Sequence, residues 1–271
     1  LGLMLFSETG GGNSNVDGAY IRAAIRDYNA DYKTKFVNLV GSLNKISDRS
    51  NSGKAGLAMW EAHQYFAGLA PEGGNNKNKT DYTGNNSGTT ASNAIYALSG
   101  NALNAKSGSP YNSPIGDGCG KNYIIYISNG AAQDSASDVS RAIAALTARG
   151  GNTSTISLSP SGSQDNPADE WARYMYQSSM GIVSYTLDVD KVTTGQGPGW
   201  TSLLKSIARV SNGKYFDVSI TVGGEIANAL GTIFTEILAV NSVFASVSLP
   251  VSVNTQGTYL NQVFIGQFRP D

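Results

Sequence analysis

The stretch Lys121-Asn-Tyr-Ile-Ile-Tyr-Ile-Ser-Asn-Gly130 decides the fold. Its residues 123–127 form an unbroken run of aromatic and β-branched side chains, which is typical of a strand covered on both faces. We therefore predict that this strand is central in its sheet. The turn residues 128–130 end it. In open α/β sheets, ligands bind at the loops that follow the strands, so Asn129 is the first candidate site residue.

A helical pattern over residues 135–149 follows this strand. Either Asp134 or Ser135 can cap the helix, because both side chains accept hydrogen bonds from a helix N-terminus. Apolar residues recur in it at a spacing that places them on one face. The two segments together predict a strand, loop and helix unit.

The same reasoning predicts the other elements of the α/β region. Residues 18–28 fit an edge strand hairpinned to a strand over residues 1–6, although a helix is also compatible with them. We expect further strands over residues 182–187 and 214–218, and helices over 54–66, 167–176, 200–210, 223–240 and the run after the cap residue Asn29. This alternation indicates an α/β fold with a Rossmann-like, mainly parallel sheet and helices on both faces.

Two segments depart from this alternation. Residues 71–117 are rich in Gly, Asn, Ser, Thr and Lys, so we interpret them as a surface insertion that carries at most one short helix. A solvated variable insert and a specific binding loop are both compatible with that composition. Residues 243–249 and 258–266 alternate without a helix between them, which predicts a β-hairpin. We therefore expect an α/β domain over residues 1–240 and a hairpin extension over residues 241–271 that leads toward a β-rich domain.

Composition excludes several classes of partner. The chain has 271 residues, and 19 basic against 20 acidic residues give a net charge of −1. This balance provides no electrostatic basis for binding nucleic acid or an anionic membrane. We find no apolar run long enough to span a bilayer. The abundance of Gly, Asn, Ser, Thr and Tyr is typical of exported surface proteins.

The sequence also lacks the usual catalytic patterns. It contains one histidine, His63, inside a predicted helix, and one cysteine, Cys119, so neither a zinc site nor a Cys/His pair is expected. A serine hydrolase is the other enzyme class that we considered, but no Gly-x-Ser-x-Gly turn is present. We expect His63 to be structural and the protein not to be an enzyme. Cys119 is either a buried thiol or has a partner elsewhere.

Several stretches of the chain are distinctive in sequence. They are Phe6 after an apolar strand, Glu61-Ala-His-Gln-Tyr-Phe-Ala-Gly68, Cys119-Gly-Lys-Asn-Tyr-Ile-Ile-Tyr-Ile-Ser-Asn-Gly130, Ala168-Asp-Glu-Trp-Ala-Arg-Tyr-Met175, Val240-Asn-Ser-Val-Phe-Ala-Ser246 and Gly266-Gln-Phe-Arg-Pro-Asp271. Together they resemble the PilY family of type IV pilus tip proteins and assembly factors, which carry a von Willebrand factor A-like domain. The resemblance covers most of the chain outside the insertion, and its most specific part is residues 240–271.

The resemblance implies a non-enzymatic protein of the cell surface that acts in adhesion and in the biogenesis of the fimbrium. Its expected location is the pilus tip, reached by export through the bacterial envelope. The implied partners are minor pilins or other tip proteins, a host or abiotic surface ligand, and the upstream and downstream parts of the same protein. A general metal-dependent binding module of the von Willebrand A type is the alternative.

The resemblance further implies a degenerate metal-ion-dependent adhesion site. Such a site takes oxygen ligands from an Asp-x-Ser-x-Ser motif, a Thr and an Asp, and no such motif precedes residues 1–6, which look like the second strand of that fold. The Thr position falls on Ser52 or Gly53, in a loop with Ser50, and Asn129 stands at the Asp position. An Asn carbonyl can coordinate a cation but brings no charge, which lowers the metal affinity.

Mg²⁺ and Ca²⁺ are the cations that such a site takes, and the candidate ligands are Ser52, Asn129 and Asp188. A second possibility groups Asp188 and Asp190, which we place directly after the strand over residues 182–187, with Asp134 or Asp138. Capping and ordinary loop roles also account for all four carboxylates.

In the von Willebrand A fold, the first strand lies between those that residues 1–6 and 123–127 resemble. Without it, both strands would lose a neighbour, and unpaired buried backbone groups are costly. We therefore hypothesise that this strand and its helix lie upstream in the full-length protein. Direct pairing of residues 1–6 with residues 123–127 would contradict this hypothesis.

Overall fold

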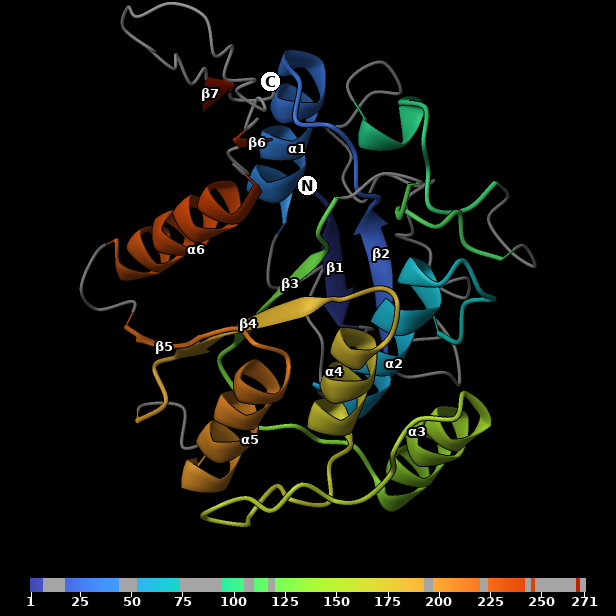
Figure 1. Ribbon diagram of the computed structural model, residues 1–271, viewed down its shortest axis with the longest axis vertical. Helices are drawn as coiled ribbons and strands as arrows, with labels where there is room; N and C mark the ends of the chain where they lie inside the picture. Colours follow the sequence, from blue (N-terminus) through green and yellow to red (C-terminus); the bar gives the residue numbers. More distant parts are fainter. Residues whose placement is uncertain are drawn as a thin grey trace, which may run out of the picture. The chain divides into compact units, whose positions relative to one another are not determined.

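Six α-helices and a three-stranded parallel sheet form a mixed α/β structure in the part of the chain that the computed structural model describes (Figure 1). That part comprises residues 1–6, 18–43, 53–73, 94–104, 110–116, 120–192, 197–219, 224–241, 245–246 and 267–268. The chain divides into two compact units, Leu1–Ile226 and Ala227–Asp271.

The parallel sheet is built around its middle strand. It consists of β3 (Tyr123–Ser128), β4 (Val183–Val189) and β5 (Tyr215–Val218), in that order across the sheet. Residues 184–189 of β4 are all buried, and successive side chains point to opposite faces, so both faces of β4 are covered. The predictions of a central strand near residues 182–187 and of a strand near 214–218 are confirmed.

The predicted central position of β3 is wrong within the described sheet. β3 pairs with β4 on one edge, and no described strand pairs with its other edge. Its side chains are mostly half-buried, and Ile127 is 46% exposed. An apolar run indicates what contacts the two faces of a strand, but it carries no information about hydrogen bonds at the edges.

A separate antiparallel pair belongs to the same unit. It consists of β1 (Leu3–Phe6) and β2 (Ala19–Ala23), which confirms the hairpin and rules out the alternative helix. β1 does not pair with β3, although the rings of Phe6 and Tyr126 lie 5.8 Å apart, edge to face. The described part of the chain therefore lacks the pairing that would have contradicted the missing-strand hypothesis.

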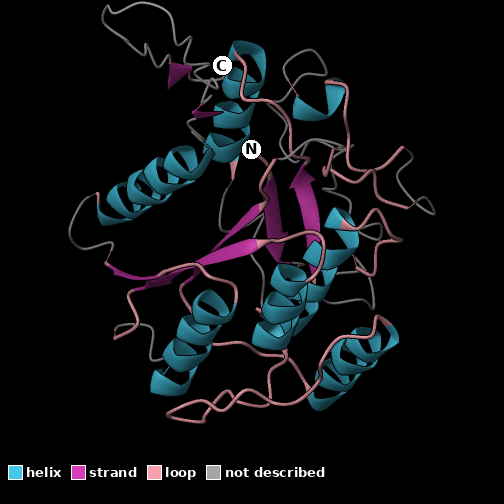
Figure 2. Cartoon of the chain, viewed as in Figure 1, coloured by secondary structure: helices cyan, strands magenta, loops and turns pink. Residues whose placement is uncertain are grey.

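Side chains and glycines next to several of the helices (Figure 2) account for where these helices begin or end. The Asn29 side chain accepts a hydrogen bond from the Tyr32 backbone N–H at 2.9 Å and so caps the first helix. After the helix of residues 197–210, Gly213 approaches the sheet so closely that a Cβ atom on this residue would lie 2.0 Å from the Ser184 carbonyl oxygen. In unit 1 the helices are α1 (Ala30–Ser42), α2 (Ala55–Phe66), α3 (Ala136–Ala148), α4 (Ala168–Gln177) and α5 (Gly197–Val210).

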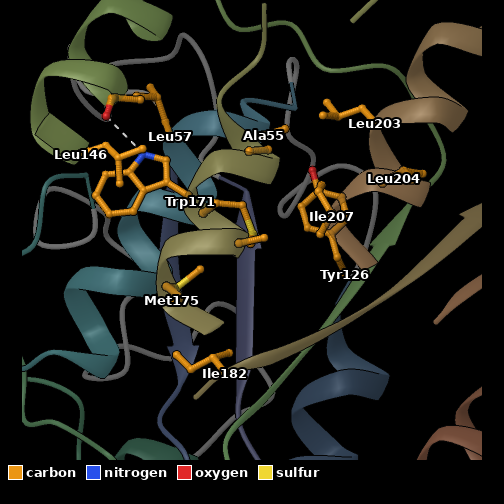
Figure 3. Packing of buried hydrophobic residues seen from close by; sticks show 14 of the residues in the cluster. Ala55, Leu57, Tyr126, Leu146, Trp171, Met175, Ile182, Leu203, Leu204 and Ile207 are labelled. Atoms are coloured by element: carbon orange, nitrogen blue, oxygen red, sulfur yellow. Dashed lines mark hydrogen bonds between the residues drawn. The ribbon is translucent and has the colours of Figure 1, made fainter. Parts of the chain in front are cut away.

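The main core forms where α4 packs against α2, α3 and α5. The Trp171 side chain is fully buried, and its indole N–H donates a hydrogen bond to the Ala142 carbonyl oxygen of α3 at 3.2 Å (Figure 3). On α2, Trp60 stacks on the same indole at 6.5 Å, and the His63 ring lies 5.0 Å from it. One aromatic side chain thus joins three helices, and His63 lies in the core, in keeping with a structural role.

Part of the expected insertion belongs to the core as well. Ala102, Leu103 and Tyr111 are buried in a cluster with Ile21 of β2 and Tyr65 of α2. The same segment carries a single 3-10 turn, η2 (Ile95–Ala97). The insertion is therefore not solely surface decoration, because its described residues cover the antiparallel pair.

The buried Glu61 carboxylate of α2 fastens this segment to the helix. It accepts hydrogen bonds from the backbone N–H groups of Glu72 and Gly73, at 2.9 and 2.8 Å, and from the Tyr111 hydroxyl. A carboxylate with several donors is well satisfied in the interior. Both ends of the segment are thus held on α2.

The C-terminal unit contains most of α6 (Glu225–Asn241) and a short antiparallel pair, β6 (Ala245–Ser246) with β7 (Gln267–Phe268). An antiparallel pair is present as predicted, but β7 follows the span expected for the second strand. The rest of both predicted strands lies outside the described residues. No described helix has the length and apolar character needed to cross a membrane.

The open edge of β3 generates a prediction for amide hydrogen exchange. Backbone N–H groups of a strand point alternately to its two edges, so about half of those in β3 point away from β4. We expect these N–H groups to exchange with water much faster than those of β4, which is paired on both sides. Uniform slow exchange along β3, equal to that of β4, would show that something pairs with its outer edge. The measurement is residue-resolved hydrogen exchange by NMR.

Candidate functional site

The loops at the carboxyl edge of the parallel sheet bring the starts of α2 and α3 together. The loop after β3 leads into α3, and the Gln133 backbone N–H donates to the Gly53 carbonyl oxygen, directly before α2, at 2.8 Å. Two helix N-termini therefore meet beside the end of β3. Helix N-termini carry unpaired N–H groups and partial positive charge, so they attract carboxylates.

A capping box starts α3. The Ser135 side chain accepts from the Asp138 N–H, and the Asp138 carboxylate accepts from the Ser135 backbone N–H and hydroxyl, both at 2.8 Å. The predicted choice between Asp134 and Ser135 as the cap is thereby decided in favour of Ser135.

A lysine from the other helix completes this group. The Lys54 ammonium lies 2.8 Å from the same oxygen of Asp138, and both side chains are about nine-tenths buried. Burial alone would raise the pKa of Asp138, but hydrogen bonds from Lys54 and Ser135 hold it below the ordinary value. The pair spans 84 positions of the sequence, so no local pattern reveals it.

Asp134 takes a different role from the one expected. It accepts from the Leu57 N–H at 3.2 Å, and from the Asn166 side chain at 2.7 Å, so it caps α2 from another part of the chain. The helix needs this cap because Lys54, its own N-cap residue, supplies no side-chain hydrogen bond. Burial raises the pKa of Asp134, whereas its hydrogen bonds partly oppose that effect.

The predicted site residues are only partly brought together. Ser50 and Ser52 lie outside the described residues. Gly53 lies at the loop edge through its carbonyl contact with Gln133, and Asn129 is exposed at the end of β3. Asn129 is the one predicted ligand that the structure shows presented to solvent.

Asp188 is not a loop residue, and this corrects the expectation. It lies within β4, is fully buried and stands opposite Ser128 of β3. Its carboxylate accepts from the hydroxyls of Thr201, at 2.7 Å, and Tyr215, at 3.0 Å. Burial raises the pKa of Tyr215, and the hydrogen bond to Asp188 raises it further, so the hydroxyl remains a donor.

Asp190 follows β4 with a positive φ of 51° and accepts from the Ser219 hydroxyl at 3.0 Å. The proposed grouping of Asp188 and Asp190 with Asp134 or Asp138 is not seen, because each carboxylate is bonded to its own neighbours. Within the described ranges, no three His, Cys, Asp or Glu side chains are placed to hold a metal ion.

One feature of the sequence was missed. Asp48-Arg-Ser-Asn-Ser52 has the Asp-x-Ser-x-Ser spacing and ends just before α2. The motif was expected before the strand of residues 1–6, whereas its spacing occurs at residues 48–52, where the sequence alone reveals it. These five residues lie outside the described part of the structure.

The charges of the described edge neutralise one another: Lys54 faces Asp138, and Asp134 faces the α2 N-terminus. Comparison of the chain with models of known protein families, with curated proteins and with solved structures found no match in any of the three.

Replacing Lys54 should reveal the strength of this internal charge pair. Lys54→Met removes the nearer cation of the buried Asp138 carboxylate and leaves, among the described residues, only the Arg141 guanidinium, at 3.8 Å, so we expect a loss of about 3 kcal/mol in the free energy of unfolding at pH 7. Because the pKa of Asp138 is lowered, the contribution from this carboxylate is present above its unfolded pKa and is lost as the pH falls through the folded value.

Lys35→Met is the matched control. Lys35 forms an i,i+4 ion pair with Asp31, which is 62% exposed, so its loss should be below about 0.5 kcal/mol. Urea denaturation of the two variants and the wild type measures both effects. Equal losses would show that the Lys54 pair is no stronger than a surface contact.

Proposed function

We propose that this chain is a non-enzymatic, von Willebrand factor A-like module of a PilY-type pilus tip protein that acts in surface adhesion and pilus assembly. The observation that carries the proposal is the set of stretches that resemble this family, from Phe6 to the C-terminal segment ending at Asp271. A mixed α/β structure with a parallel sheet is compatible with such a domain.

The proposed location is the tip of a type IV pilus, outside the cell. The proposed partners are minor pilins or other tip proteins and a host or abiotic surface ligand. Neither nucleic acid nor an anionic membrane is a proposed partner, since the net charge of −1 provides no attraction to either.

Other parts of the same protein are also proposed partners. β1 and β3 each have one edge without a described strand, and their aromatic side chains Phe6 and Tyr126 are in contact. A strand from upstream in the protein would pair with both edges and satisfy their backbone groups. Such a strand would be buried on both faces and therefore apolar along its whole length.

The loop edge around Asn129 is the proposed adhesion surface. The lysine at the start of α2 supplies the positive charge that a divalent cation would supply in a metal-dependent module, and it already neutralises Asp138. We therefore favour binding that needs no bound ion. The exposed Asn129 amide offers both a donor and acceptors to a partner.

A metal-dependent binding module is the second candidate. The spacing of Asp48, Ser50 and Ser52 favours it, because aspartate and serine oxygens suit Mg²⁺. Adhesion that is abolished by EDTA and restored by Mg²⁺ would support this candidate over ion-independent binding.

Genetic replacement in the source bacterium tests the proposal. Deleting the gene should remove surface adhesion and reduce the number of pili, and the wild-type gene should restore both. Asn129→Arg should leave the pili assembled but weaken adhesion, because a bulky cation would occupy the proposed binding surface. Pilus counts by electron microscopy and an adhesion assay provide the two readouts.

Asn38→Arg is the matched control, since Asn38 is exposed on α1 and undergoes the same change. It should affect neither readout. Normal pili and normal adhesion in the deletion strain would contradict the proposed function. Equal loss of adhesion in both arginine variants would contradict the assignment of the loop edge.

A further inference from the structure

We propose that Asp169 and Glu170, in the first turn of α4, form a buried acid pair that holds one proton in the folded protein, and that loss of this proton destabilises the fold. This pair does not depend on the proposed role at the pilus, because its two carboxyl groups play no part in the loop edge described above.

Both side chains are removed from water. Asp169 is 1% exposed and Glu170 is 2% exposed. Neither forms an ion pair with a basic side chain in the described part of the chain, although the two carboxyl groups lie within hydrogen-bonding reach of each other. Two adjacent buried carboxylates would repel each other strongly, and sharing a proton removes this repulsion.

The hydrogen bonds leave one oxygen that needs a proton. Glu170 Oε1 accepts from the Ile156 backbone N–H at 2.9 Å, and Asp169 Oδ2 accepts from the Ser206 hydroxyl at 2.6 Å. Glu170 Oε2 is buried, and no donor from the described residues reaches it. An ionised carboxyl can only accept, so a hydrogen bond between the two groups requires that one be protonated. We place the proton on this oxygen of Glu170, from which it is donated to Asp169.

The nearest basic groups are engaged with other partners. On α4 itself, Arg173 attracts Asp169 electrostatically, but its guanidinium donates to the carbonyl oxygens of Asn152 and Ser154. On α5, Arg209 donates to the Ser206 hydroxyl at 3.1 Å.

Among the described residues, the other elements around the pair bring no further cation. From α2, the titratable side chain that contacts α4 is His63, whose ring lies against Trp171 and Tyr174. The loop over residues 151–160, which contains Ile156, has no charged residue. The pair is therefore neutralised by a proton.

The direction of the pH dependence follows from burial. Burial raises the pKa of Glu170 from an ordinary 4.5 to about 8, and the charge of Asp169 adds to this effect. Burial also raises the pKa of Asp169. The folded state thus keeps a proton that the unfolded state releases. This contribution to stability is fully present below the unfolded pKa of Glu170 and is lost progressively as the pH rises to about 8.

The pair lies where three parts of unit 1 meet. Glu170 holds the loop through Ile156, Asp169 holds α5 through Ser206, and both residues belong to the N-terminal turn of α4. A second negative charge here would act on all three parts at once. We therefore expect alkaline pH to loosen this junction before the rest of the core.

Glu170→Gln provides the first test. The glutamine carbonyl can still accept from Ile156, and its amide can donate to Asp169 in place of the acid proton. The variant should melt close to the wild type at pH 5.5 and higher by about 4 °C or more at pH 8.5. The control is Asp165→Asn, an exposed carboxylate just before α4, and its difference from the wild type should not change with pH. A Glu170→Gln difference that is constant between the two pH values would overturn the proposal.

If Glu170→Gln does not fold, the number of protons that the wild type releases on unfolding provides a second test. Unfolding at pH 6.5 should release about one proton from this pair, because the unfolded carboxyl groups are ionised at that pH. Calorimetric unfolding in buffers of different ionisation enthalpy measures the net number, and the same measurement on His63→Gln removes the opposing proton uptake by His63, whose pKa burial lowers in the folded state. Release of about one proton per molecule at pH 6.5, which falls toward zero above about pH 8, supports the shared proton. No release, or uptake, would overturn it.

Discussion

Parallel pairing of β4 with both β3 and β5 is the constraint on which unit 1 depends. Because the three strands run in one direction, the segment after each strand must return across a face of the sheet, and here it does so as helices. The core follows from this requirement, since α4 and α5 reach the buried side chains of the sheet through Trp171 and the apolar face of α5. The same constraint places the loops after β3 and β4 at a common edge.

Buried or half-buried carboxylates then have three separate structural roles in this unit. Asp134 caps a helix that lacks a cap of its own, Asp138 starts α3 and neutralises Lys54, and Asp188 ties β4 to α5 and β5. Each has partners that satisfy an ionised group. Asp169 and Glu170 do not, and for that reason a proton rather than a cation completes their environment.

The elements of the fold were largely predictable, whereas the contacts between them were not. Apolar periodicity located α1 and α5, Asn29 marked the start of α1, and Pro167 indicated α4. The apolar run of β3 predicted a strand, but it predicted neither the partial exposure of its side chains nor its edge position in the described sheet. The neighbours of a strand are set by backbone groups that look alike in every sequence. Asp188 was placed in a loop because a carboxylate inside a buried strand breaks the apolar pattern.

The candidate site was predictable only in part for the same reason. Asn129 follows directly from the end of a strand, but the bond between Lys54 and Asp138 joins positions 84 apart. Nothing local distinguishes Lys54 from a solvated lysine. Its ammonium supplies positive charge at an edge where a metal-dependent module would hold a cation.

We propose that this edge binds its partners without a metal ion. Anomalous scattering from crystals soaked in Mn²⁺ tests it most directly, because Mn²⁺ prefers the same oxygen ligands as Mg²⁺. We predict no anomalous peak beside Gly53, Asn129 or Asp188, since Lys54 already neutralises Asp138 and Asp188 is already bonded to two hydroxyl groups. A peak with several oxygen ligands at that position, including those of Ser50 or Ser52, would contradict the account and establish the metal-dependent alternative.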